Sequence, residues 1–216
     1  PSTFEDAEGV FKKYDVWDRV PSSVKNRFLA GLKGDIPDTP KSDDYVFQNC
    51  YSELVGTNIQ ALIAASREAE QQGYRPLILS STVEGEAREV VKVLTAIAKE
   101  IRSSGNPFPP PACILCGGET TVTVRGTGVG GRNHELTLAA ALALEGPHPR
   151  VVLSAGTDGI DGLAETAGAV VDPTTVGRLR ASGTDARAAL DRLRSAAPGA
   201  PVAEALGAAV AARWGP

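Results

Sequence analysis

The chain of 216 residues contains no methionine, only two histidines and three cysteines, and aromatic residues make up just 5% of it. Aliphatic side chains therefore have to supply the hydrophobic core. Three cysteines are too few for the disulfide framework of a small secreted protein. Because the sequence begins at Pro1 and has no methionine, we expect it to be part of a longer protein.

An excess of positive charge and a long hydrophobic run are also missing. The formal net charge of -4 gives no general attraction to nucleic acid or to an anionic membrane. No apolar stretch approaches the roughly 18 residues of a membrane span, and the N-terminus lacks the basic and apolar regions of a signal peptide. We therefore expect a cytoplasmic globular protein that binds neither nucleic acid nor membranes.

Two of the cysteines, Cys113 and Cys116, have the spacing of half a zinc site or of a redox pair. They lie in "ACILC", which is typical of a strand, and side chains three positions apart on a strand point to opposite faces. Because one metal ion cannot then reach both sulfur atoms, we interpret them as core cysteines.

The first 34 residues predict two short helices, with Ser2 and Glu5 as a capping box for the first. The stretch 34–44, "GDIPDTPKSDD", has no periodicity and predicts a linker. We therefore divide the chain into a helical segment with its linker at 1–43, an α/β domain at 44–190, and an alanine-rich and proline-rich tail at 191–216.

From residue 45 onward, short apolar runs alternate with segments of helical period, which is the pattern of strand-helix units in a layered α/β/α sandwich with a largely parallel or mixed sheet. Capping boxes at Thr57 with Gln60, and at Ser81 with Glu84, indicate where two of the helices begin. The expected elements are helices at 58–73, 84–105 and 133–144, and strands at 75–80, 112–116, 121–125, 151–156 and 168–172.

Three glycine-rich segments, 116–120, 125–133 and 154–162, each follow an expected strand. In open α/β sheets ligands bind beyond the carboxyl ends of the strands, so these segments are the candidate sites. The middle one has the strongest argument, because its glycines allow close backbone approach and the helix after it offers free N–H groups to an anion. Its glycines are Gly126, Gly128, Gly130 and Gly131.

Arg132 follows those glycines at the expected start of a helix, where a cation is disfavoured unless an anion lies beside it. Asn133 suits the N-cap and Glu135 suits the first turn. An ordinary loop with an exposed arginine is the alternative to an anion site. Residues 126–131 also fit G-x-G-x-x-G, a weak sign of dinucleotide binding, since no acidic residue follows at the expected strand end.

Two aspartates, Asp158 and Asp161, lie in the glycine-rich segment 154–162, and Glu119 lies in the segment 116–120. Carboxylates of this kind hold Mg²⁺ together with substrate phosphates, or one of them acts as a general base. The alternative is that both aspartates simply form turns. His134 has no nucleophile near it in a recognisable motif, so we interpret it as a surface or packing histidine.

The motifs "CGGETTVTVRGTGVGGRNHE", "VVLSAGTDGIDG" and "AGAVVD" resemble the C-terminal MOFRL domain of glycerate kinases, a group also named hydroxypyruvate reductases. The resemblance covers about residues 1–190. It implies the C-terminal lobe of a two-lobed α/β enzyme that transfers the γ-phosphoryl group of ATP to D-glycerate with Mg²⁺, typically giving 2-phosphoglycerate, and a homodimer is a possible assembly.

By motif position, the resemblance places Arg132 in the cleft as a ligand of substrate or phosphate, and makes Asp158 catalytic or metal-organising. Asp161 would share the metal. Supporting roles fall to Gly128, Gly130, Gly131, Glu119, Asn133 and Glu135.

The sequence departs from the family in three places. His134 stands where glutamine is usual, the N-terminal lobe is missing, and the closing motif after residue 190 is replaced by the alanine-rich tail, as a truncated gene or a frameshift near residue 191 would produce. A nicotinamide-dependent hydroxypyruvate reductase and a ligand-binding module without catalysis stay open as alternatives.

Overall fold

The computed structural model describes residues 2–123, 129–148 and 150–194, with side chains up to Asp191. Contacts divide the chain into two compact units, Pro1–Val55 and Gly56–Pro216, which we describe separately. The division falls after Val55, beyond the segment 34–44 in which the composition placed the linker. Residues 48–57 also form no helix or strand. The connection between the units therefore extends beyond residue 44, where the proline-rich and glycine-rich composition ends.

The first unit contains α1 (Phe4–Tyr14) and α2 (Ser22–Leu32), which confirms the prediction of two short helices in the first 34 residues. Short 3-10 turns form at Trp17–Arg19 and Tyr45–Phe47. The capping box of α1 is formed by Thr3 and Asp6, one residue later than expected.

An aromatic cluster holds these two helices together. Phe28 of α2 is buried and meets three rings edge-on, at centroid distances of 5.0 to 6.1 Å. The rings belong to Phe4, Phe11 and Trp17. Edge-to-face pairs of this kind add to the energy of burial, so four of the few aromatic residues build the small core of this unit.

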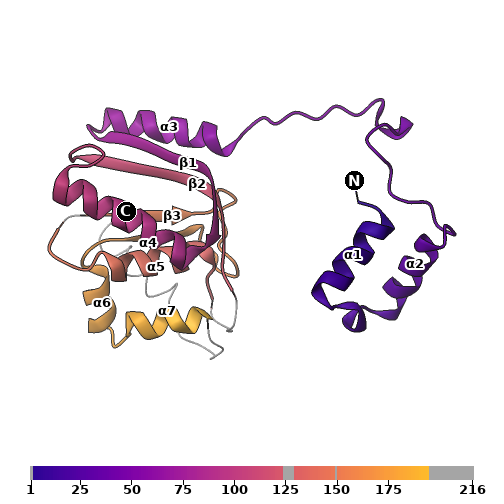
Figure 1. The fold of residues 1–216 in the computed structure, drawn as a ribbon. Coiled ribbons are helices and arrows are strands. Elements are labelled where there is room, and N and C mark those ends of the chain that lie inside the picture. Colours follow the sequence, from indigo (N-terminus) through magenta and orange to yellow (C-terminus); the bar gives the residue numbers. More distant parts are fainter. Residues whose placement is uncertain (1, 124–128, 149, 195–216) are drawn as a thin grey trace. The chain divides into compact units, whose positions relative to one another are not determined.

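The second unit is a mixed α/β body (Figure 1). Its elements are α3 (Asn58–Gln71), β1 (Arg75–Glu86), α4 (Ala87–Ser104), β2 (Ala112–Thr121), α5 (Arg132–Ala143), β3 (Val152–Ala155), β4 (Gly168–Val171), α6 (Thr175–Ala181) and α7 (Ala186–Arg194). The Thr57–Gln60 capping box is present at the start of α3, as predicted. In the described part of the chain no helix has the length and apolar character needed to cross a membrane.

Two strand pairs form the sheets. β1 and β2 run parallel, from Arg75 opposite Ala112 to Glu86 opposite Thr121, with register shifts between Ile78 and Ser80 and between Ser80 and Val83. Helix α4 makes the crossover between the two strands. β3 and β4 pair in antiparallel fashion. The α/β class is therefore confirmed, with one parallel and one antiparallel pair.

Strands β1 and β2 are both longer than predicted. Ser81 and Glu84 lie inside β1, so their predicted capping box is wrong, and α4 begins at Ala87 with Glu86 as its N-cap. The reason is the ladder: the end of β1 pairs with residues 118–121 of β2, and these backbone bonds outcompete a local cap.

The segment 116–120, predicted to be a loop, is the second half of β2. Gly118 has a φ of +145° there, and a side chain at this position would run into the backbone of Val83 in β1. The strand predicted at 121–125 is wrong in its described part, because β2 ends at Thr121, and Val122 and Thr123 belong to no strand. Residues 124 and 125 lie outside the described residues.

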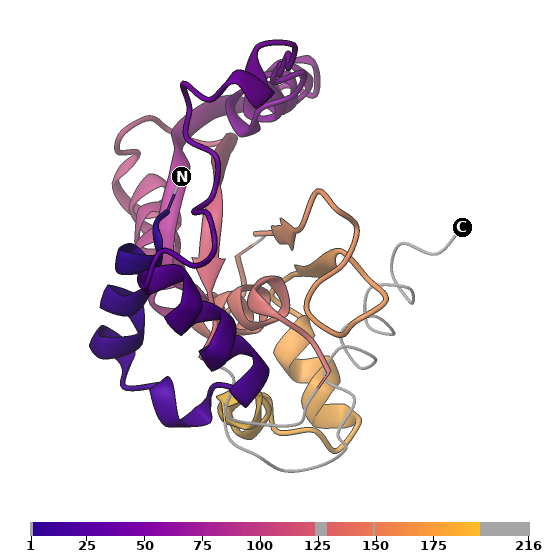
Figure 2. The same ribbon diagram turned by 90° about the vertical axis from the view of Figure 1, so that its right-hand side faces the viewer.

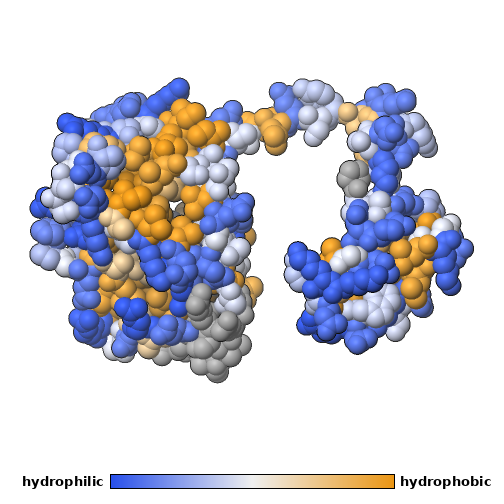
Figure 3. Space-filling model, viewed as in Figure 1, coloured by the Kyte–Doolittle hydropathy of each residue, from blue (hydrophilic) through white to orange (hydrophobic). Residues whose placement is uncertain are grey.

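Helix α5 is the centre of the second unit. It packs against α4, against β3 and β4, and against α6 and α7 (Figure 2), and Leu138 and Ala140 on it are fully buried. Helix α3 lies along the β1–β2 pair, above the strands in Figure 1, with α4 below them. Ile59 and Ile63 on α3 and Val93 on α4 stay partly exposed. Figure 3 shows hydrophobic surface on the face of this unit that is turned toward the viewer.

Candidate anion site at the start of helix α5

Arg132 is the first residue of α5, with Gly131 as the N-cap. Its Nη2 atom lies 2.9 Å from Oε1 of Glu119, which lies near the C-terminal end of strand β2. The structure thus brings two of the predicted site residues together. The side chains of Arg132 and Glu119 are 32% and 73% exposed, so the pair contributes little to stability and the arginine is open to a ligand.

The start of α5 is capped from another part of the chain. Asp161, 1% exposed, accepts hydrogen bonds at Oδ1 from the backbone N–H of Asn133 at 3.1 Å and from its side-chain amide at 3.0 Å. Its Oδ2 accepts the N–H groups of Gly131 at 3.1 Å and of His134 at 2.9 Å. A carboxylate at this place satisfies the free N–H groups of the first turn and opposes the positive end of the helix.

This geometry corrects the prediction that Asn133 is the N-cap. Gly131 is the N-cap residue, and it has no side chain to accept a bond, so the distant carboxylate of Asp161 does so instead. Asn133 is the second residue of the helix, and its Oδ1 accepts the hydroxyl of Ser154 in β3 at 2.6 Å. The side chain therefore ties α5 to the neighbouring sheet.

His134 is almost wholly buried, and its imidazole lies between two partners. Nδ1 is 2.5 Å from Oδ2 of Asp161, and Nε2 is 3.2 Å from the hydroxyl of Thr166. Sequence reasoning allowed for a packing histidine but did not find its partner 27 positions away. The only signal was that the position takes glutamine in the resembling family, which also offers a hydrogen-bonding amide.

Burial by itself raises the pKa of the Asp161 carboxyl, but hydrogen bonds from the His134 side chain and from the N–H groups of His134 and Asn133 oppose it. The net effect is a pKa below the ordinary value of an aspartate. Because these donors favour the ionised form, a fixed negative charge holds the loop and the helix together.

Asp158 is arranged differently. It is exposed, and its Oδ1 accepts the N–H of Ile160 at 3.3 Å, as a turn-forming aspartate does. Gly159 between them has a φ of +85°, a conformation that favours glycine. Much of the Asp158 carboxylate remains open to solvent directly after β3.

The glycines before Arg132 are held close to the Asp161 loop. A Cβ atom on Gly131 would lie 2.5 Å from Oδ1 of Asp161 and 2.8 Å from the N atom of Gly162, so no larger residue fits without a shift. Gly130 has a φ of +134°. Gly128, the other predicted ligand of the phosphate, lies outside the described residues.

Glu135 points into the protein and is fully buried. Its Oε1 lies 2.7 Å from Nε of Arg88 in α4, and Oε2 has no hydrogen-bond partner. Arg88 also donates from Nη2 to the carbonyl of Leu190 in α7 at 2.7 Å. This contact favours a structural role for Glu135, joining α4, α5 and α7, over direct contact with a ligand.

Cys113 and Cys116 lie half-buried in β2, and burial raises the pKa of both thiols. Within the described ranges, no three of the histidine, cysteine, aspartate and glutamate side chains gather as ligands of one metal ion.

The second unit is thus an α/β domain in which Arg132 begins a largely buried helix whose first turn is capped by Asp161. Residues 112–211 match the MOFRL family. The match continues past residue 190, across much of the alanine-rich tail.

The comparisons also relate the chain to glycerate kinases. The glycerate 2-kinase of Pyrococcus horikoshii is 39% identical over 186 residues, and the D-glycerate 2-kinase of Thermotoga maritima is 38% identical over 184 residues. These alignments cover 86% and 85% of this chain, but 41% of each relative.

Two solved structures are also similar to this chain. The crystal structure of glycerate kinase from Thermotoga maritima matches 95% of this chain with a TM-score of 0.70 at 35% identity. That of a protein from Pyrococcus horikoshii matches 96% with a TM-score of 0.64 at 36% identity. Each match covers 45% of the solved chain, so this chain spans less than half the length of the relatives it matches.

Proposed function

We propose that the chain forms the C-terminal part of a glycerate kinase, which transfers the γ-phosphoryl group of ATP to D-glycerate and gives 2-phosphoglycerate. The observation that carries the proposal is the exposed guanidinium of Arg132 at the start of α5, in a chain related to glycerate 2-kinases over most of its length. Phosphoryl transfer needs positioning and charge neutralisation above all. An arginine whose backbone is held between residues bonded to Asp161 supplies a positioned positive charge.

Arg132 is the proposed ligand of a phosphate or of the glycerate carboxylate. Glu119 holds the guanidinium in place and would release it in part when an anion arrives, because both side chains are exposed. We propose that the anion lies beside Gly130, while Gly131 keeps the segment close to Asp161. Gly128 belongs to the same glycine-rich sequence and remains a proposed ligand of the phosphate. Asn133 would orient the helix start rather than touch the ligand, since its side chain already bonds Asp161 and Ser154.

Asp158 is the proposed catalytic or metal-organising residue. Mg²⁺ usually takes one or two protein carboxylates together with phosphate oxygens and water, and the exposed Asp158 carboxylate fits that requirement. Bound there, the metal would neutralise the phosphate charge that develops during transfer. Asp161 is a poorer direct ligand, because its two oxygens already accept hydrogen bonds from the first turn of α5, so we assign it the positioning of that turn.

The test is the activity of the full gene product that contains this chain, followed by ³¹P NMR of the product. Arg132→Ala should lower kcat/KM for D-glycerate by about 100-fold or more, the usual cost of losing one charge-stabilising donor. Arg67→Ala, an exposed arginine of α3, is the matched control. A rate within about twofold of the parent for Arg132→Ala would contradict the role of Arg132.

A nicotinamide-dependent reductase is the second candidate, favoured by the G-x-G-x-x-G spacing before α5. Titration with NADH, followed by cofactor fluorescence, separates the two, because the proposed kinase site should show no saturable signal. A ligand-binding role without catalysis would appear as a rise in melting temperature with MgATP or glycerate in the absence of product.

Assembly and location belong to the same proposal. We keep the expectation of a cytoplasmic enzyme whose C-terminal lobe, a layered α/β/α sandwich from 44 to 190, follows a helical remnant of the first lobe at 1–43. A homodimer is tested by sedimentation of the full gene product.

A further inference from the structure

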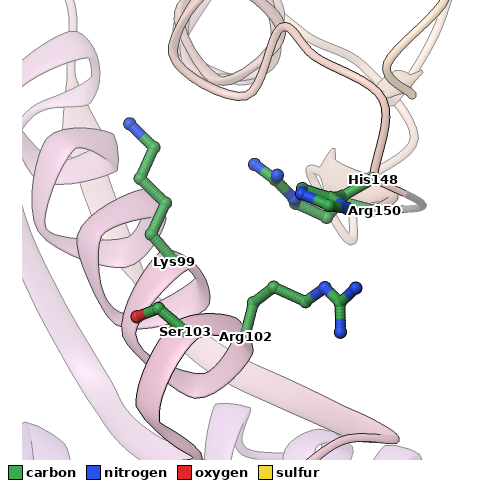
Figure 4. A pocket seen from close by; sticks show the side chains of 5 residues that line it. All are labelled: Lys99, Arg102, Ser103, His148 and Arg150. Atoms are coloured by element: carbon green, nitrogen blue, oxygen red, sulfur yellow. The ribbon is translucent and has the colours of Figure 1, made fainter.

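A second cluster of charge surrounds a pocket of about 410 Å³ in the Gly56–Pro216 unit. Lys99, Arg102 and Ser103 project from the end of α4, and His148 and Arg150 reach toward them from the segment before β3 (Figure 4). Three of these five side chains are cationic and the described lining contains no carboxylate. In a chain with a formal net charge of -4, this is a local accumulation and not part of a generally basic surface.

The cations have no partner of opposite charge. In the part of the chain that the structure describes, the side chains of Lys99, Arg102 and Arg150 form neither an ion pair nor a hydrogen bond. Four other arginines of this unit do form ion pairs, namely Arg88, Arg132, Arg178 and Arg180. Like charges in one pocket repel each other, and an anion bound between them removes that cost.

The Nε atom of Arg150 is buried and has no hydrogen-bond partner. A buried donor of this kind is normally satisfied, and one without a partner indicates a missing acceptor. The hydroxyl of Ser103 is a further donor at the rim, because its bond to the carbonyl of Glu100 is long at 3.4 Å. The pocket therefore offers donors of three chemical types to one acceptor-rich ligand.

The end of α4 explains only part of this cluster. Arg102 lies in the last turn, where a cation opposes the negative end of the helix. That account does not reach Arg150, which comes from a different segment and whose Nε atom faces no carbonyl as a partner. Two independent segments supplying cations to one pocket favour a ligand over helix capping.

The pocket is separate from the site at Arg132. Helix α4 begins directly after β1, at the strand end that pairs with Thr121, and its last turns lie at the other end of the strands. Arg150 precedes β3, whereas Asp158 follows it. The topology thus puts Arg102 and Arg150 near the N-terminal ends of the strands, and Glu119 and Asp158 near their C-terminal ends.

We propose that Lys99, Arg102, Ser103 and Arg150 form a second anion site, which binds the phosphate group of a small molecule. Guanidinium groups bind phosphate oxygens through two parallel bonds, and lysine adds a point charge. The volume exceeds that of a phosphate ion and lies within the range of small-molecule sites, so an organic part can enter with the phosphate.

Calorimetric titration of the purified chain with inorganic phosphate, at constant ionic strength, tests the site. It is carried out in the Arg132→Gln background, so that the site at α5 does not contribute and failure of the kinase proposal leaves the result intact. Arg150→Gln and Arg102→Gln should each weaken binding by about tenfold. Arg67→Gln on α3 should leave it within about twofold, as expected for an exposed charge outside the pocket.

Arg102 is exposed, so Arg102→Gln keeps the test valid if Arg150→Gln disturbs folding. A parallel titration with glycerol phosphate distinguishes the free ion from an ester: tighter binding of the ester assigns the remaining volume to its organic part, and equal affinity assigns the site to phosphate alone. The proposal is overturned if the Arg132→Gln chain shows no saturable binding of either probe, or if Arg67→Gln weakens it as much as Arg102→Gln.

Discussion

Oδ2 of Asp161 and Nδ1 of His134 lie 2.5 Å apart in a place closed to solvent, and this contact joins the loop after β3 to the first turn of α5. The same carboxylate accepts the backbone N–H groups of Gly131 and His134. Arg132 lies between these two residues in the chain, so its backbone is held on both sides. The position of Arg132, the residue proposed to bind the anion, therefore depends on Asp161, which is 29 positions away in the sequence. Asp161 itself is assigned no contact with the anion.

Replacing Asp161 by asparagine should lower the stability of the chain. The asparagine amide is uncharged and has one acceptor oxygen in place of two. If its NH2 group takes the place of Oδ2, the N–H groups of Gly131 and His134 lose their acceptor; if its oxygen does, they keep an acceptor without the charge. We expect a loss of about 2–3 kcal/mol in the free energy of unfolding, measured by urea at pH 7. Asp158→Asn, in the same loop but exposed, should change it by less than about 0.5 kcal/mol. Equal small effects of both changes would show that Asp161 does not hold α5.

The same pair predicts a dependence on pH. The pKa of Asp161 is lower in the folded chain than in the unfolded one, because hydrogen bonds from His134 and Asn133 outweigh the effect of burial. A lowered folded pKa gives stability that is present above the unfolded pKa and is lost as the pH falls through the folded pKa. The unfolded pKa of an aspartate is about 3.9.

We therefore expect the difference in unfolding free energy between the parent chain and Asp161→Asn to be present at about pH 5 and to shrink below about pH 4. Comparing the two chains removes the contribution of Asp172, whose pKa is also lowered in the fold. Urea unfolding at several pH values measures the difference. A difference that stays constant or grows toward pH 3 would contradict the assigned direction of the shift.

Gly131 tests the close approach between the two segments. In Gly131→Ala the new methyl group would lie 2.5 Å from Oδ1 of Asp161 and 2.8 Å from the backbone N atom of Gly162, and the backbone cannot move aside freely. Overpacking of this kind should cost about 1–3 kcal/mol. Gly177→Ala in α6 is the matched control, because nothing lies within 4 Å of its added carbon.

Replacing a helical glycine that has no neighbours by alanine should raise the free energy of unfolding by about 0.5–1 kcal/mol. Gly177→Ala should therefore raise the melting temperature and Gly131→Ala should lower it. Gly131→Ala should also weaken binding at Arg132, since the helix start moves. An unchanged or raised melting temperature for Gly131→Ala would mean that the two segments are not in contact.

The sequence predicted the parts of this protein that depend on local rules. The helices of the first unit and the helix after Gly131 were predicted from their sequence patterns, and the Thr57–Gln60 box from capping chemistry. The caps predicted for α1 and α5 were wrong. Glu119 and Arg132 were expected in neighbouring segments, and the structure pairs them.

Contacts between distant residues were not predictable in the same way. The extension of β1 through Ser81 to Glu86 depends on a partner strand more than 30 residues later, and it overrides a local capping signal. Asp161 was predicted as a metal ligand, and its capping of α5 was not predicted, because nothing local to 158–162 indicates which N–H groups its carboxylate meets. Long-range pairing decides both cases.

The ion pair of Arg88 with Glu135 should be strongly coupled, because neither side chain is open to water. Arg88 is 11% exposed and Glu135 is fully buried, with Nε and Oε1 at 2.7 Å. Glu135→Leu leaves the arginine charge buried without this carboxylate and should cost about 3 kcal/mol or more. Arg88→Met should cost a similar amount for the opposite reason, and it also removes the bond to the carbonyl of Leu190.

Replacing both residues together removes the two charges from the interior, so the double variant Arg88→Met with Glu135→Leu should lose less than either single variant, as is seen when apolar residues replace buried ion pairs. Lys92→Met provides the control on α4, because the Lys92–Glu89 pair is exposed and should be worth less than about 1 kcal/mol. The measurement is a double-mutant cycle by urea unfolding. If the two single losses simply add in the double variant, the two side chains are not coupled and the contact does not join α4 to α5.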